Sequence, residues 1–231
     1  MITDNNKNLK ELVEKKFKNK KILLISDTYE SQINGVVTTI KMVKKYLNNL
    51  NLNYSLIDTE NFYNISLPFY KDIKLALNPK KIYNLIENTN PSFIHIFTEG
   101  PVGYFAHKYC LKNNLKYTTS YHTNWPVYSK IFFPLNFLNL EEKIYDYLKS
   151  IHNNSLGTLV TNSEMKNLLM NKNFKNLKEW SREVDGNIFN PNKKNDYIFA
   201  NLEKPILLFV GRLSKEKNTE EFLKLKTKGT K

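Results

Sequence analysis

Two basic side chains, Arg212 and Lys217, have a spacing suited to binding a diphosphate. They lie in the stretch Gly211 to Asn218, directly after the apolar run Pro205 to Val210. This run is typical of a buried strand, so the two cations fall in the loop that leads into a helix. Fixed positive charges at a helix N-terminus attract phosphate groups, because the backbone N–H groups there also point outward at the ligand. We therefore expect an anion site in this loop.

The loop from Thr28 to Val37 is a second candidate for anion binding. It follows an apolar run and holds Asn34 and Gly35 just before a helical pattern. A single glycine does not make the GxGxxG fingerprint, so a nicotinamide or flavin enzyme is not expected. Gly35 still allows backbone N–H groups to approach an anion closely. The alternative is an ordinary turn between a strand and a helix.

Two further polar loops carry groups that could act on a ligand. Glu99 follows the run Phe93 to Phe97, where its carboxylate could accept bonds from ligand hydroxyl groups or stabilise a helix start. His122 follows the run Tyr117 to Tyr121, and an imidazole there could donate to a ligand oxygen or polarise a leaving group. A purely structural histidine is the alternative.

Alternating strand and helix patterns must position these loops. Short apolar runs typical of strands buried on both faces occur at Lys21 to Asp27, Tyr54 to Asp58, Phe93 to Phe97, Tyr117 to Tyr121, Thr158 to Thr161 and Leu177 to Trp180. Helical periodicity occurs between them at Val36 to Leu47, Lys80 to Glu87 and Tyr104 to Lys112. The alternation predicts an α/β fold with a doubly wound parallel sheet. In such sheets ligands collect at the carboxyl ends of the strands, where the polar loops lie.

The 231 residues are expected to form one full domain and part of another, because two α/β domains would need roughly 100 to 200 residues each. We expect an N-terminal extension at residues 1–20, a Rossmann-like domain at 21–184, an Asn-rich linker at 185–204 and the truncated start of a second Rossmann-like domain at 205–231. One strand and one helix cannot cover both faces of that strand. The strand Ile206 to Val210 would then dock elsewhere, pair with another chain or stay poorly packed.

The amino-acid composition limits the classes of binding partner but does not identify one. The formal net charge of +13 could attract nucleic acid, phosphate-bearing ligands or an anionic membrane face, or could reflect scattered lysines on a solvated surface. The sequence has no nucleic-acid motif and no basic stripe, so a nucleic-acid partner is not expected. The single cysteine, Cys110, allows no intramolecular disulfide, and the sequence shows neither a signal peptide nor a bilayer-spanning apolar run. We expect a cytoplasmic protein.

Six short motifs follow one another along the chain: NGVV (Asn34 to Val37), TEGPVG (Thr98 to Gly103), SYHTNWPVY (Ser120 to Tyr128), TNSEM (Thr161 to Met165), WSREVD (Trp180 to Asp185) and VGRLSKEKN (Val210 to Asn218). Taken in this order, they resemble glycosyltransferase family four, and in particular its branch of mannosyltransferases and glycolipid synthases that act on lipid acceptors. The resemblance covers nearly the whole chain from Lys21 onward. SYHT followed by a proline, and WSR-x-VD followed by GR-x4-K, are fairly specific in combination, whereas NGVV alone is not.

The resemblance implies the GT-B architecture, in which two Rossmann-like domains face each other across a cleft. Such enzymes move a sugar from a nucleotide sugar to an acceptor, with retention of anomeric configuration and without a metal ion or other cofactor. By matching motif positions, Gly35 would donate to the donor diphosphate and His122 would contact the transferred sugar. Arg212 and Lys217 would neutralise the departing diphosphate. Glu99 is a second catalytic candidate, and the remaining cleft candidates are Asn34, Tyr121, Thr123 and Arg182.

Two features depart from the family pattern. Glu183 stands where relatives often have glycine, and the downstream pair of glutamates that binds donor sugar and ribose has no counterpart in the sequence. Two hypotheses therefore stand side by side. The chain is a glycosyltransferase or its acceptor-side part, or it is an inactive, truncated remnant that acts as a binding module.

An apolar segment, Ile131 to Leu140, adds a hypothesis of membrane contact. The segment lies next to the SYHT motif, and together with the net positive charge it could touch the anionic inner face of a membrane. The alternative is a core or interdomain segment, which Pro134 and the short length favour.

Overall fold

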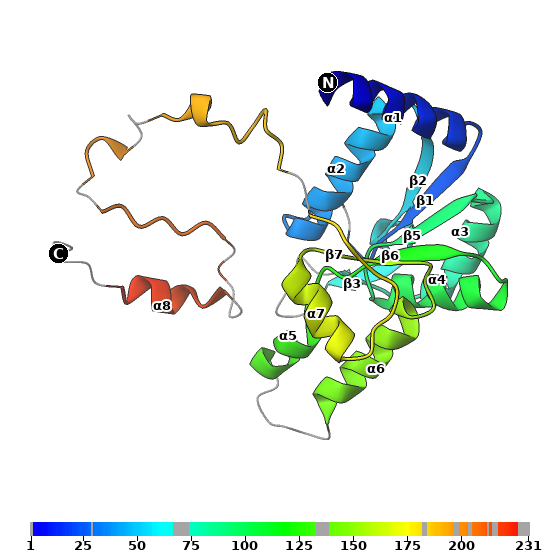
Figure 1. Cartoon of the computed structure of the whole chain (residues 1–231). Coiled ribbons are helices and arrows are strands. Elements are labelled where there is room, and N and C mark those ends of the chain that lie inside the picture. The colour runs from blue at the N-terminus through cyan, green and yellow to red at the C-terminus, as the bar shows by residue number, and fades with distance from the viewer. Residues whose placement is uncertain are drawn as a thin grey trace. The chain divides into compact units, whose positions relative to one another are not determined.

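The computed structural model of the chain divides into two units, and each is described by itself (Figure 1). Unit 1 comprises residues 1–124 and 143–182, and unit 2 comprises residues 125–142 and 183–231. The structure describes residues 2–28, 30–66, 74–132, 139–181, 184–195, 199–202, 205–211, 213 and 217–225.

A parallel sheet runs through unit 1. Within the described residues it has six strands, β1 (Lys21–Ile25), β2 (Asn53–Ile57), β5 (Phe93–Ile96), β6 (Tyr117–Ser120), β7 (Thr158–Val160) and β8 (Leu177–Glu179). Their order is β2-β1-β5-β6-β7-β8, and every neighbouring pair is parallel. Each strand coincides within two residues with a predicted apolar run, and the predicted doubly wound α/β fold is confirmed.

The strand order reverses between β1 and β5. The chain first moves outward from β1 to β2, and it then returns to the other side of β1 to form β5. The loops that follow β1 and β5 lead to helices on opposite faces of the sheet, α2 after β1 and α4 after β5. Ligands of open α/β proteins bind at this switch point.

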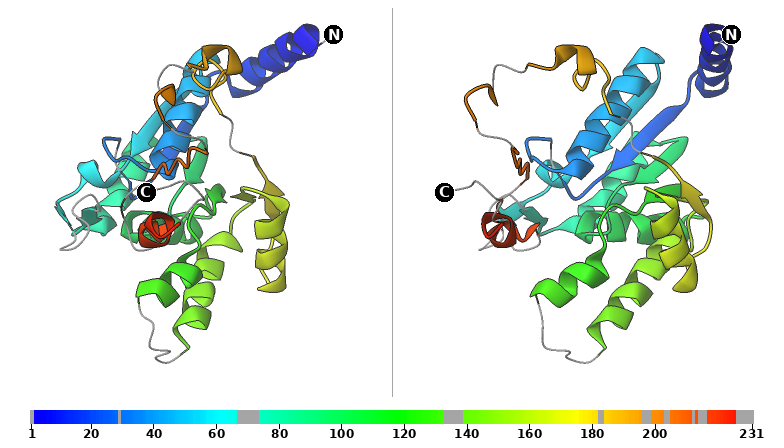
Figure 2. Two further views of the ribbon diagram at one scale, coloured as in Figure 1. Left: turned by 90° about the vertical axis from the view of Figure 1, so that its left-hand side faces the viewer. Right: turned by 60° about the vertical axis from the view of Figure 1, so that its left-hand side comes forward.

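Helices cover both faces of the sheet (Figure 2). On one face, α3 (Ile82–Thr89) and α4 (Pro101–Lys112) pack against Leu23 and Ile25 of β1. On the other face, α2 (Gly35–Asn49) packs against Ile22 and Leu24. Successive side chains of one strand point to opposite faces, so both sets of residues must be apolar. This explains why β1 is an unbroken apolar run in the sequence.

The remaining helices of unit 1 complete its cores. A third core cluster joins α6 (Leu140–His152) and α7 (Ser163–Asn171) to the β7 and β8 side of the sheet, through residues that include Leu148, Val160 and Leu169. The predicted N-terminal extension contains a helix, α1 (Ile2–Phe17). Its last residue, Phe17, contacts β5 through Phe93, with 4.8 Å between ring centroids.

Short elements between β2 and α3 were not predicted. They are η1 (Thr59–Asn61), β3 (Asn64–Ser66), β4 (Lys74–Ala76) and η2 (Pro79–Lys81), with β3 and β4 paired in antiparallel fashion. A strand of three residues is too short to show a clear alternation of apolar and polar side chains. The fold of these residues is set by packing, because Phe62 and Ala76 are buried in the same core as α3.

In unit 2 the structure contradicts one prediction. The described elements there are α5 (Trp125–Phe132), η3 (Pro191–Lys193) and α8 (Thr219–Leu223). The predicted strand at Pro205 to Val210 is wrong, since residues 205–210 are neither strand nor helix. The side chains of Leu208 and Val210 are 67% and 85% exposed. An extended segment needs a neighbour to satisfy its backbone N–H and C=O groups, and in the described residues no strand pairs with it.

The apolar segment Ile131 to Leu140 falls mostly outside the described residues, since residues 133–138 are not among them. In the part of the chain that the structure does describe, no helix combines the length and the apolar character needed to cross a bilayer. The predicted domain limits at residues 20, 184 and 204 remain predictions.

Candidate functional site

A carboxylate at the end of β1 holds the start of α4. Asp27 accepts hydrogen bonds from the backbone N–H groups of Val102, at 2.7 Å, and Gly103, at 3.1 Å. Thr98 donates its hydroxyl to the same carboxylate at 2.9 Å and accepts the backbone N–H of Asp27 at 2.6 Å. The N-cap residue of α4, Gly100, has no side chain to do this. Asp27 therefore caps α4 from another strand and fixes the loop after β5 to the end of β1.

The environment of Asp27 opposes its ionisation. Burial raises the pKa of Asp27 from 3.8 to about 6, and the negative charge of Glu99 adds to this rise. The bonds from Val102, Gly103 and Thr98 favour the charged form but do not cancel the effect of burial. The cap of α4 is therefore an anion that changes its charge in the weakly acidic range.

Two glycines allow this close approach. A Cβ atom on Gly100 would lie 2.5 Å from Cγ of Asp27, and one on Gly103 would lie 1.9 Å from the carbonyl oxygen of Thr98. Real Cβ atoms do not approach other atoms so closely. The glycines of the TEGPVG motif are therefore required by the contact between β1, the loop after β5 and α4.

Glu99 points into unit 1 and is only 6% exposed. Its Oε1 lies 3.2 Å from Nε2 of His152, and its backbone carbonyl accepts the hydroxyl of Tyr147 at 2.5 Å. Of the two predicted roles, the helix start is served by Asp27 instead. Glu99 thus lies in the loop after β5 with its carboxylate engaged by a histidine of α6.

His122 rests on an aromatic support at the same edge of the sheet. Its ring stacks on Phe97, with 5.9 Å between centroids and 9° between planes. Phe97 in turn meets His95 edge to face at 4.4 Å. His95 bridges Thr118 and Ser120, and burial lowers its pKa to about 4, so it is neutral near pH 7. The imidazole of His122 is therefore positioned by a rigid, uncharged stack.

The loop after β1 ends in a well-formed helix start. Asn34 is the N-cap of α2, and its side chain accepts the backbone N–H of Val37 at 2.9 Å. Gly35 is the first residue of α2 and is exposed. The first N–H groups of a helix have no acceptor within the helix, and the first turn of α2 contains no acidic residue. This turn can therefore hold an anion.

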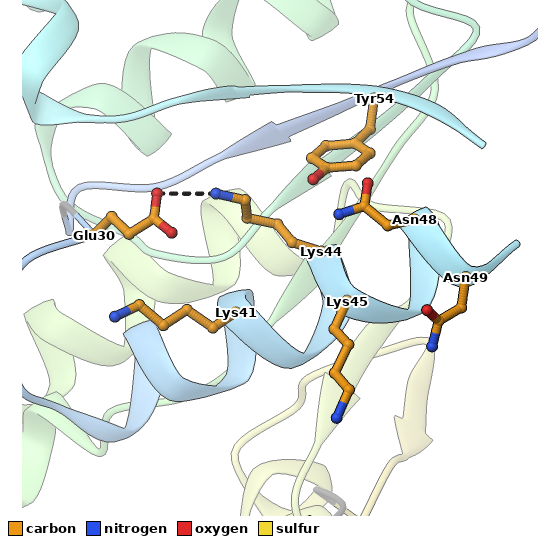
Figure 3. Close-up of a pocket in the computed structure, with 7 residues that line it drawn as sticks. All are labelled: Glu30, Lys41, Lys44, Lys45, Asn48, Asn49 and Tyr54. Atoms are coloured by element: carbon orange, nitrogen blue, oxygen red, sulfur yellow. Dashed lines mark hydrogen bonds and ion pairs between the residues drawn. The ribbon is translucent and has the colours of Figure 1, made fainter. Parts of the chain in front are cut away.

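An open pocket of about 530 Å³ lies between α2 and β2 (Figure 3). Figure 3 shows Lys44 of α2 reaching to Glu30, and their charged groups are 2.9 Å apart. The hydrogen bond and charge of Lys44 lower the pKa of Glu30. Because Glu30 belongs to the loop after β1, this ion pair ties the loop to the helix that Asn34 caps. The pocket is lined by Glu30, Lys41, Lys44, Lys45, Asn48, Asn49 and Tyr54.

The other predicted site residues fall in different places. Tyr121 is 2% exposed and packs in the core beside Phe174, while Thr123 is partly exposed in the loop after β6. Lys217 is exposed, two residues before α8. Arg182 and Arg212 lie outside the described residues, as does Glu183. The structure thus brings Asn34, Gly35, Glu99 and His122 to one edge of the unit 1 sheet.

Sequence reasoning missed three residues of this edge: Asp27, Tyr147 and His152. One signal was available for Asp27, because an aspartate ends the first apolar run while the helix start at Gly100 lacks a capping side chain. The histidine and the tyrosine lie about 50 residues from Glu99 in sequence. No local pattern links them to it.

Comparison with models of protein families matches residues 33–181 to Glycosyltransferase Family 4. The match covers nearly two thirds of the chain and includes Gly35, Glu99 and His122. It ends before Arg182. A search of curated proteins found no match.

We predict that Gly103→Ala destabilises unit 1 by about 1–3 kcal/mol, because the new methyl group overpacks the carbonyl of Thr98. Gly157→Ala is a matched control, since Gly157 is also buried but a Cβ there would come no closer than 3.7 Å to its nearest neighbours, Asn176 and Lys178. Urea unfolding of the three proteins measures the difference. Equal unfolding free energies for both variants would contradict the contact.

We predict that Asp27 makes the stability pH-dependent. Its pKa is higher in the folded protein than the ordinary 3.8, so its contribution is greatest below about pH 4 and is lost as pH rises toward 6. The unfolding free energy of the wild type should therefore fall relative to Asp27→Asn over this range, by at most about 1.4 kcal/mol per pH unit. Asp146→Asn, at an exposed carboxylate, is the control. Parallel curves for wild type and Asp27→Asn would refute the prediction.

Proposed function

The chain belongs to glycosyltransferase family 4, and from this premise we propose that it transfers a hexosyl group from a nucleotide sugar to an acceptor hydroxyl, with retention of configuration. Transfer of a sugar is the activity that the family membership supports in general. The observation that carries the finer proposal is the convergence of three family-matched loops on one edge of the sheet. These loops, after β1, β5 and β6, flank or adjoin the point where the strand order reverses.

The proposed site for the donor diphosphate is the first turn of α2. Its N–H groups lack acceptors within the helix, and Gly35 places no side chain between them and a ligand. The Glu30–Lys44 ion pair and the Asn34 cap hold the turn in place before any ligand arrives. A site formed in advance binds more tightly, because less ordering is needed at binding.

His122 is proposed to contact the transferred sugar. Its stacking on Phe97 fixes the plane of the imidazole at the carboxyl edge of the sheet. In the reaction, the bond between the anomeric carbon and a diphosphate oxygen breaks, and the acceptor oxygen bonds to the same face of that carbon. The proton of the acceptor hydroxyl leaves with the diphosphate. A hydrogen bond from His122 to a sugar oxygen would orient the sugar for this step.

Arg212 and Lys217 are proposed to neutralise the departing diphosphate. The leaving group gains negative charge as its bond to the sugar breaks, and two cationic side chains would stabilise that charge without a metal ion. A guanidinium group also matches the two-oxygen geometry of a phosphate, which an ammonium group does not.

A lipid hydroxyl is the proposed acceptor, as in a diacylglycerol or a phosphatidylinositol derivative. The motif resemblance to lipid-acceptor mannosyltransferases supports it, as does the net charge of +13, which favours an anionic membrane face. Trp125 and Val127 of α5 are 44% and 48% exposed, and apolar side chains of this kind favour contact with lipid.

We predict that His122→Ala and Lys217→Ala each lower kcat for sugar transfer by on the order of 100-fold, because each removes a group that orients or stabilises the reacting centre. The measurement is release of nucleoside diphosphate from a panel of nucleoside-diphosphate hexoses. Lys112→Ala, at an exposed lysine at the C-terminal end of α4, should keep wild-type kcat. A wild-type chain that turns over no donor on the panel would overturn the proposed function, and unchanged kcat in both variants would overturn the residue roles.

We predict that labelled hexose appears in the lipid fraction when anionic vesicles containing diacylglycerol or phosphatidylinositol are supplied. The rate should fall several-fold between low and high salt, since screening weakens attraction to the vesicle surface. Free hexose serves as the competing soluble acceptor. Faster transfer to the soluble sugar than to either lipid would contradict a lipid acceptor while leaving sugar transfer intact.

A further inference from the structure

One helix holds Glu99 at two points. The hydroxyl of Tyr147 donates to the backbone carbonyl of Glu99, and Nε2 of His152 lies 3.2 Å from its Oε1. Both side chains come from α6. Glu99 follows Thr98, which is itself bonded to Asp27. The loop after β5 is therefore held from the β1 side by Asp27 and from the α6 side by this pair.

The imidazole of His152 has little freedom to move. The residue is completely buried, and the rings of Tyr121 and Phe174 lie 5.7 and 6.0 Å from it. Its Nδ1 lies 2.9 Å from the hydroxyl of Thr119 on β6, which is 2.8 Å from the hydroxyl of Thr158 on β7. One ring thus connects two strands of the sheet to the loop that follows a third.

This arrangement holds Glu99 in place. The backbone of residue 99 is held through its carbonyl by Tyr147, and the side chain is held through Oε1 by His152. A carboxylate buried this deeply needs a hydrogen-bonding or charged partner, because taking the charge out of water is expensive. The His152 contact supplies one and orients the group at the same time.

Resting on the proposed function, we propose that His152 is a positioning residue for sugar transfer, which together with Tyr147 holds Glu99 and the loop after β5 in place at the carboxyl edge of the sheet, where the sugar is proposed to bind. The role is indirect, since His152 acts only through Glu99. A loop beside the reacting atoms must keep its position within a fraction of an ångström to favour the reacting geometry.

Two substitutions at His152 separate its two contacts. His152→Gln places an amide nitrogen near the position of Nε2 and can still donate to Glu99, but it loses the contact with Thr119. His152→Asn places its amide near Nδ1 and can still bond Thr119, but it does not reach Glu99. We expect similar unfolding temperatures for the two variants. We expect kcat to fall at least 10-fold in His152→Asn and less than 3-fold in His152→Gln, with unchanged affinity for the free nucleoside diphosphate.

Tyr147→Phe tests the second contact without disturbing the buried imidazole. Phenylalanine keeps the ring that stacks on Tyr104 at 5.5 Å but cannot donate to the carbonyl of Glu99. We expect kcat to fall several-fold with unchanged nucleoside-diphosphate affinity. If neither His152 variant folds, the kcat of Tyr147→Phe still tests whether α6 positions Glu99.

A signal that does not depend on turnover completes the experiment. The carboxyl carbon resonance of Glu99, assigned with Glu99→Gln, should move in His152→Asn and stay in place in His152→Gln. Equal losses of kcat in both His152 variants, a wild-type rate in His152→Asn, or a resonance that moves equally in both would overturn the proposal. A wild-type chain without transfer on any donor would overturn the proposed function instead, and the resonance would still report whether His152 holds Glu99.

Discussion

The carboxylate of Asp27 at the start of α4 is the interaction on which the edge of the unit 1 sheet depends. It satisfies two N–H groups of a helix whose own cap residue is a glycine, and it binds the hydroxyl of Thr98. Because β1 and β5 are neighbours on either side of the switch point, this single group ties together the loops that follow these two strands. The glycines at 100 and 103 follow from it, since a side chain at either position would occupy space that the contact requires.

Two neighbouring carboxylates have different tasks at this edge. Asp27 accepts backbone N–H groups, so its negative charge serves the helix start. Glu99 meets an imidazole from α6, so its hydrogen-bonding partner comes from the side of the sheet that carries β6 and β7. Each charge raises the free energy of the other, which is one reason why the pKa of Asp27 is raised. Unfavourable interactions between close acidic groups are common at functional sites, where the charges serve chemistry and lower stability.

The sequence was sufficient for the elements that show a periodic pattern and insufficient for contacts between distant residues. The strand that begins at Lys21 and the helix that begins near Gly35 were found because buried strands and amphipathic helices leave a local pattern. The pair β3 and β4 was too short for any pattern. Residues 205–210 have the apolar pattern of a buried strand, but no described strand pairs with them. A strand needs a neighbouring strand to bond its backbone groups.

The residues of the candidate site likewise divide into those that the sequence predicts and those that it does not. Gly35, Glu99 and His122 could be found because each follows a predicted strand at the edge where ligands collect. The roles of Asp27 and His152 were not predicted, since the loop after β5 and the start of α4, on which they act, lie between 53 and 76 residues away from them in the chain. Their function depends on which strands become neighbours, and the strand order is a property of the folded sheet alone.

The two helix starts at the switch point are not equivalent, and this bears on where a diphosphate would bind. The start of α4 already holds an anion, Asp27, so a phosphate group there would have to displace a carboxylate and meet its charge. The start of α2 is capped by the neutral amide of Asn34 and has no acidic residue in its first turn. The positive end of its dipole is therefore not compensated by a protein charge. A dianionic ligand at this edge of the sheet is favoured at α2 and opposed at α4, which would direct the donor diphosphate to Gly35.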